Sequence, residues 1–137
     1  MRTRVRRFAH VLERLGLAMA GAASGLFVAA HVGSSIGALT SQAFILVMMI
    51  AGGVGFYLGI DTPPQAVVGP GGERKVDAAD LLSALGTFLA AAAAFASVTV
   101  IVLREDMHLA GTIAIMAGWV IGVVMQTVAG AIARARA

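Results

Sequence analysis

The sequence predicts an all-α integral membrane protein with four transmembrane helices arranged as two hairpins. Three observations predict this fold class. The 137 residues are 59% hydrophobic and 12% charged, whereas an ordinary soluble domain has about a quarter charged residues. The mean hydropathy is +0.91, and a soluble domain of this size keeps too much surface in water to hide so many apolar side chains. The charged residues also divide the chain into apolar stretches long enough to cross a bilayer.

The first hairpin is predicted over residues 15–60, because no charged residue lies between Arg14 and Asp61. A helix needs about 20 residues to cross the hydrocarbon core, so this interval holds two spans and a tight turn. Its most polar part, residues 37–42, is assigned to the turn. Ser41 is expected to cap the helix that follows, since a serine hydroxyl accepts hydrogen bonds from the first free backbone N–H groups.

A loop is predicted over residues 61–80, which contain all three prolines and six charged residues. The second hairpin is predicted over residues 81–133. Asp77 is expected to begin the third helix as part of a capping box, and Asp106 is a candidate N-cap of the fourth. The four expected spans are residues 15–36, 43–60, 81–103 and 107–132.

The distribution of basic residues predicts the orientation. Nine of the ten lie in the termini or in the loop, and only Arg104 lies in a short turn. Positive charge accumulates on the cytoplasmic side, so both termini are expected in the cytoplasm and the chain in a bacterial inner (cytoplasmic) membrane. The excess of basic over acidic residues is expected to bind lipid headgroups and not nucleic acid. The arginines expected at headgroups are Arg2, Arg4, Arg6, Arg7, Arg14, Arg134 and Arg136.

The two terminal segments carry these arginines. Residues 1–14 place Val5, Phe8 and Leu12 at helical spacing with arginines on the other side, which predicts a basic amphipathic segment lying in the membrane interface. A plain helix end with anchoring arginines is an equally good interpretation. Residues 134–137 form a basic tail.

Small residues recur along all four predicted helices. Helices in lipid associate by close packing, and small residues separated by three positions allow their backbones to approach. The spacing does not tell whether the partner helix belongs to this chain or to another. The residues expected at helix contacts are Gly21, Gly25, Gly33, Gly37, Gly55, Gly59, Gly111, Gly118, Gly122, Ala90 and Ala94.

His31 is the one ionisable residue expected within the hydrocarbon. It follows Arg14 by 17 residues, about 25 Å along a helix, which places it in the outer fifth of the core. With Ser34 and Ser35 it could bind a ligand, a quinone headgroup or a proton. The alternative, which the sequence favours, is a neutral histidine that is hydrogen-bonded to neighbouring helices.

No metal or cofactor is assigned. The chain has no cysteine, which excludes thiolate chemistry and iron–sulfur clusters. It has no phosphate-binding loop or zinc-protease motif. A metal site shared by His31, His108, Glu105 and Asp106 on the outer side of the membrane is a conceivable alternative.

The predicted function is that of a small non-enzymatic membrane protein, an accessory or assembly subunit within a homo-oligomer or a larger complex. Membrane lipids and other membrane-protein subunits are the expected partners. Two alternatives remain: a small oligomeric channel or transporter, or a quinone or redox-complex subunit that uses His31. The spans hold no acidic or basic side chain away from their ends, which disfavours ion-coupled transport.

Overall fold

The described part of the chain is helical throughout apart from its turns. The computed structural model describes residues 2–60 and 78–136, and the predicted loop with the Asp77 cap lies mostly outside them. Each α-helix in these ranges is long and apolar enough to cross a membrane, which confirms the predicted all-helical class with four such helices. They are α1 (Arg2–Ser35), α2 (Gln42–Ile60), α3 (Ala78–Leu103) and α4 (Leu109–Arg136), with a 3-10 turn, η1 (Gly37–Leu39), between α1 and α2.

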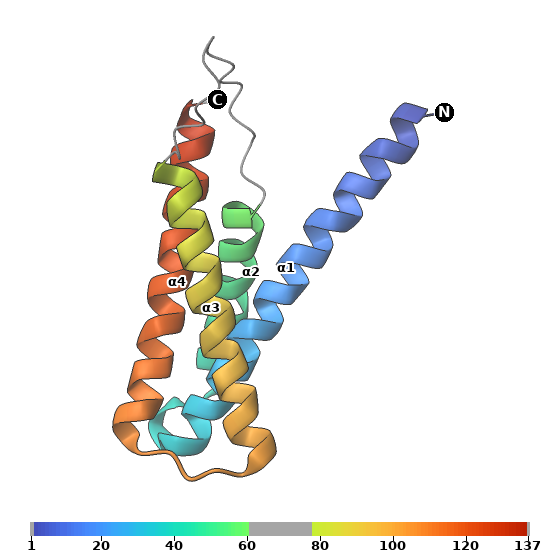
Figure 1. Ribbon diagram of the computed structural model, residues 1–137. Helices are drawn as coiled ribbons and strands as arrows, with labels where there is room; N and C mark the ends of the chain where they lie inside the picture. The colour runs from blue at the N-terminus through green and yellow to red at the C-terminus, as the bar shows by residue number, and fades with distance from the viewer. Residues whose placement is uncertain (1, 61–77, 137) are drawn as a thin grey trace.

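The helices pack as two hairpins side by side (Figure 1). α1 makes its most extensive contacts with α2, and α3 makes its most extensive contacts with α4; α2 and α4 join the hairpins. The start of α1 and the end of α4 lie at one end of the molecule, called here the terminal end. The α1–α2 and α3–α4 turns lie at the opposite end, called the turn end (Figure 1).

The first half of α1 leaves the bundle. α1 has 34 residues, about 51 Å of helix, whereas the hydrocarbon core is about 30 Å thick. Its N-terminal part, called here the α1 arm (residues 2–14), projects away from the other helices (Figure 1). Phe8 is 65% exposed, and Val5 and Leu12 are exposed on the same arm. Residues 2–14 and the first span therefore form one uninterrupted helix.

The cap at the start of α2 is the one that the sequence predicts. The backbone N–H of Phe44 donates a hydrogen bond to Oγ of Ser41 over 3.2 Å, and this confirms Ser41 as the cap of α2. Before it, Ile36 is extended, with φ −124° and ψ 96°. The chain therefore reverses direction within a few residues.

The start of α4 differs from the prediction. α4 begins at Leu109, and the N–H groups of Gly111 and Thr112 both point to the carbonyl oxygen of His108, at 2.9 and 3.2 Å. His108 therefore occupies the N-cap position, and the assignment of Asp106 to it was wrong. The physical reason lies in the residues between α3 and α4, because residues 105 to 108 are not helical and the first helical turn begins after them.

This non-helical segment follows a left-handed residue at the end of α3. Arg104 has φ 54°, and its N–H bonds to the Ile101 carbonyl while the N–H of Glu105 bonds to the Val100 carbonyl. This pattern is the Schellman motif, whose left-handed position is usually glycine. Arginine at this position carries a backbone strain of about 1 kcal/mol.

Glycines bring the helix backbones into contact within each hairpin. A Cβ added at Gly21 of α1 would overlap the carbonyl oxygen of Gly52 of α2, and the reverse holds as well. Gly25 lies in the same way against the carbonyl of Met48. In the second hairpin, a Cβ at Gly122 would lie 2.7 Å from the carbonyl oxygen of Gly86. These glycines set the distance between the paired helices.

The other residues that were predicted to pack between helices differ in what they contact. Gly55 and Gly59 of α2 lie against Gln126 of α4, and Gly33 lies against the carbonyl of Leu39. Ala90 and Ala94 are buried. A Cβ at Gly111 would meet only Met107, from its own turn.

Gly37 and Gly118 do not bring helices into close contact in the described chain, because a Cβ at either would meet no atom within 4 Å. The backbone contacts of Gly52, Gly86 and Gly130 were not predicted.

We expect Gly21→Ala to lower stability by about 1–3 kcal/mol, because the added methyl forces α1 and α2 apart. Unfolding in detergent can be followed by the fluorescence of Trp119, the only tryptophan of the chain. Gly16→Ala is the matched control in the same helix, since nothing lies within 4 Å of that position. The control should be neutral or slightly stabilising. Equal losses in both variants would contradict the role of Gly21.

Candidate functional site

Three polar residues of α4 face the interior of the bundle at regular steps. Thr112, Trp119 and Gln126 are separated by seven residues, two helical turns, so they lie on one face. Each is at most 1% exposed. Buried polar groups in lipid have no water to bind, so each needs a partner from a neighbouring helix.

Helix α1 supplies two of these partners with the same seven-residue step. Oγ1 of Thr112 lies 3.4 Å from Nε2 of His31, and Nε1 of Trp119 donates to Oγ of Ser24 over 3.1 Å. Because α1 and α4 are antiparallel, the pair nearest the turn end joins a late residue of α1 to an early residue of α4. We call His31, Ser24, Thr112, Trp119 and Gln126 the polar seam.

The third residue of α4 finds its partner on α3. Nε2 of Gln126 donates to Oγ1 of Thr87 over 2.9 Å. Its Oε1 is fully buried and has no hydrogen-bond partner, although Gly55 and Gly59 of α2 leave room for the side chain. The seam thus links α4 to α1 near the turn end and in its middle, and to α3 nearer the terminal end.

The surroundings of His31 support the second interpretation of this residue, a histidine that is hydrogen-bonded to a neighbouring helix. The residue is 2% exposed, and its ring nitrogen lies against a hydroxyl of α4. Ser34 and Ser35, which were predicted to join it in a polar stripe, donate their hydroxyl protons to the backbone carbonyl of His31 at 2.7 and 3.2 Å. Both serines therefore bond to their own helix.

A cavity opens beside His31 at the turn end. Its volume is about 650 Å³, within the range of ligand pockets. It brings together the predicted candidates His31, Ser34 and Ser35 from α1 with the charged residues of the α3–α4 turn. The lining residues are Ala30, His31, Ser34, Ser35, Val100, Ile101, Arg104, Glu105, Asp106, Met107 and Leu109.

The conceivable metal site does not form. Within residues 2–60 and 78–136, no three His, Asp or Glu side chains gather closely enough to hold an ion. His108 does not line the cavity that contains His31, because it occupies the N-cap position of α4. The suggestion that His31, His108, Glu105 and Asp106 share a metal was therefore wrong.

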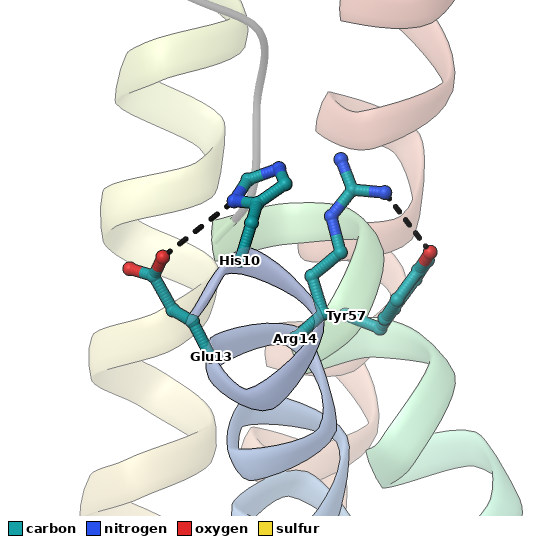
Figure 2. A network of polar contacts seen from close by, with 4 residues as sticks. All are labelled: His10, Glu13, Arg14 and Tyr57. Atoms are coloured by element: carbon teal, nitrogen blue, oxygen red, sulfur yellow. Dashed lines mark hydrogen bonds and ion pairs between the residues drawn. The ribbon is translucent and has the colours of Figure 1, made fainter. Parts of the chain in front are cut away.

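At the terminal end, Arg14 and Tyr57 meet where the α1 arm leaves the bundle (Figure 2). Nη1 of Arg14 donates to Oη of Tyr57 over 3.4 Å, and the guanidinium carbon lies 5.7 Å from the ring centroid. An arginine over an aromatic face is attracted by the ring quadrupole. His10 and Glu13 pair at 3.7 Å on the exposed side of α1.

The arginines predicted at headgroups occupy different surroundings. Arg134 donates to the carbonyls of Leu58 and Gly130 at 3.0 and 3.1 Å, so it ties α4 to α2. Arg7 and Arg136 are exposed. Arg2, Arg4 and Arg6 lie in α1, and their side chains are outside the described part.

The helices and the polar seam define a multi-pass membrane bundle held together by backbone contacts and buried hydrogen bonds. Comparison with protein-family models, with curated proteins and with solved structures finds no match. The residues of this chain alone therefore carry the functional argument.

Sequence reasoning missed most of the seam. Of its five residues, the sequence analysis singled out only His31. The signal was present in the seven-residue spacing of Thr112, Trp119 and Gln126, matched by the seven residues between Ser24 and His31.

We expect Ser24→Ala to lower stability by about 1 kcal/mol, because it leaves the Trp119 N–H without an acceptor in a dry interior. In a double variant with Trp119→Phe the loss should be smaller than the sum of the single losses, since donor and acceptor disappear together. Thermal unfolding followed by circular dichroism measures both.

Ser35→Ala serves as the control for this experiment, because that hydroxyl bonds only to its own helix, and its unfolding temperature should not change. Strictly additive losses at Ser24 and Trp119 would argue against a coupled pair.

Proposed function

We propose that this protein is a non-enzymatic accessory or assembly subunit that packs against other membrane helices, in a homo-oligomer or a larger complex. The observation that carries the proposal is Gly118. Its neighbour in the predicted motif, Gly122, is buried against α3, but a Cβ added at Gly118 would meet no atom of another helix within 4 Å. A glycine in an exposed helix interior costs about 1 kcal/mol relative to alanine, and intrachain packing does not explain it.

Other small residues surround Gly118 on the outside of α4. Ala110, Ala114 and Ala117 are exposed and lie within two turns of it. We call these four residues the α4 small face. Small residues allow the backbone of a second helix to approach closely, which is how helices associate in lipid. The face therefore suits a helix of another subunit.

The filled interior also favours an assembly role over a channel formed by one copy. Val28, Val32 and Trp119 are almost fully buried in the centre of the bundle. A channel would need a pore between several copies. A redox role would need His31 to bind a group from the membrane, whereas its Nε2 already lies against Thr112.

We further propose that the chain resides in a bacterial inner membrane with both termini in the cytoplasm. The exposed Arg7 and Arg136 at the terminal end support this orientation, since basic residues concentrate on the cytoplasmic side.

We expect Gly118→Leu to abolish self-association or the capture of partner subunits while the monomer stays folded. The leucine blocks close approach at the α4 small face, and no intrachain atom lies within 4 Å of the position of its Cβ. Native mass spectrometry of protein extracted in mild detergent measures the assembly, and circular dichroism measures folding.

Two controls sharpen this experiment. Gly16→Leu places the same side chain at another open glycine and should leave assembly unchanged. His31→Ala should also leave it largely unchanged, because His31 faces the interior. The proposal would be refuted if native mass spectrometry showed the wild-type protein only as a monomer without any partner.

The orientation is tested by single cysteines in the cysteine-free background. Ala38→Cys, exposed in the α1–α2 turn, should react with a membrane-impermeant thiol reagent added outside intact spheroplasts. Ala135→Cys, exposed at the end of α4, should react only after the membrane is opened. The reverse pattern would show that the termini face outward.

A further inference from the structure

The cavity at the turn end, which the proposed assembly role does not use, has the features of a binding site. We infer that it holds the headgroup of a phospholipid carrying both a phosphate and a primary amine, the chemistry of phosphatidylethanolamine. Four groups of observations support this inference: the unpaired charges around the cavity, the ring nitrogen of His31 that has no hydrogen bond with the described residues, the backbone of Arg104, and the apolar wall.

The first observation concerns the charged side chains. Arg104, Glu105 and Asp106 all line the cavity, yet none forms a salt bridge or a side-chain hydrogen bond with the described residues. One positive and two negative groups thus face the same space without neutralising one another. A ligand with both signs of charge complements this arrangement.

The second observation is the free nitrogen of His31. The side chain is 2% exposed and lines the cavity. Its Nε2 lies near Thr112, whereas Nδ1 takes no hydrogen bond from the residues that the structure describes. A histidine ring nitrogen can donate or accept a hydrogen bond, so Nδ1 is available to a ligand in the cavity.

The third observation is the backbone of Arg104. Its φ of 54° lies in the region that favours glycine, so the arginine side chain is present at a strained position. The strain is offset when the guanidinium binds a ligand. A guanidinium fits phosphate oxygens with two parallel hydrogen bonds.

The remaining residues that line the cavity favour a primary ammonium over a quaternary one. A primary ammonium donates three hydrogen bonds, and the carboxylates of Glu105 and Asp106 can accept them. The hydroxyl oxygens of Ser34 and Ser35 add acceptors, because their protons are already given to the His31 carbonyl. A quaternary ammonium is instead recognised by aromatic rings, and no aromatic residue lines the cavity.

The position and the wall point to a lipid as the source of this headgroup. The cavity lies at the ends of apolar helices, the level at which headgroups lie in a bilayer. Ala30 of α1 and Ile101 of α3 are exposed beside it, and they provide an apolar surface for the glycerol and the start of the acyl chains.

Lipid competition tests the inference. Purified, delipidated full-length protein is mixed with equal amounts of phosphatidylethanolamine, phosphatidylcholine and phosphatidylglycerol that share the same acyl chains, and retained lipid is measured by native mass spectrometry. We expect about tenfold preference for phosphatidylethanolamine, as charge-assisted hydrogen bonds provide. Equal retention of the three lipids would overturn the inference.

Arg104→Gly is the informative variant because glycine suits the left-handed backbone and the fold should survive. It should reduce the retention of phosphatidylethanolamine about tenfold. Glu105→Gln combined with Asp106→Asn should remove the preference over phosphatidylglycerol. Arg7→Ala, at the opposite end of the molecule, is the matched control and should bind like the wild type.

Two outcomes would refute the assignment. Unchanged lipid retention by Arg104→Gly would show that the guanidinium does not bind the headgroup. Displacement of the lipid by soluble phosphoethanolamine at an equal concentration would show that the acyl chains contribute nothing, and would assign the cavity to a soluble ligand.

Discussion

The contact between Gly21 and Gly52 is the constraint on which the rest of the bundle depends. The backbones of α1 and α2 touch there, and Trp119 of α4 packs against the same point, with Cζ2 3.0 Å from the position of a Cβ at Gly52. The carbonyl of Gly21 accepts the hydroxyl of Ser24, which in turn accepts the Trp119 N–H. One crossing thus positions three helices and the middle of the polar seam.

Within this frame, the polar groups act as selective pairs between helices that are otherwise apolar. Lipid offers no preference for one apolar helix face over another, so packing and hydrogen bonds decide which faces meet. The pairs of His31 with Thr112 and of Gln126 with Thr87 hold α4 against α1 and α3 respectively. Arg14 and Arg134 join α2 to α1 and α4 at the terminal end. The register of α4 is therefore fixed at both ends and in its middle.

The sequence predicted the helices well because charge, proline and caps determine where an apolar helix begins and ends. Ser41 is one such local signal. Contacts between helices were harder, because a glycine pair with suitable spacing does not specify its partner. Gly118 and Gly122 belong to one motif, yet only Gly122 meets another helix of this chain. The assignment of Asp106 as the N-cap was wrong because the non-helical segment after Arg104 follows a left-handed residue that composition does not reveal.

The divergence of the α1 arm has a consequence for the surrounding bilayer. α1 separates from the other helices toward the terminal end (Figure 1), so the described helices together are wider at that end than at the turn end. In a bilayer, a bundle of this shape displaces more lipid on its wider side than on its narrower side. Many copies gathered in one patch would bend the membrane around them, with the curvature set by the angle at which a single helix leaves its bundle.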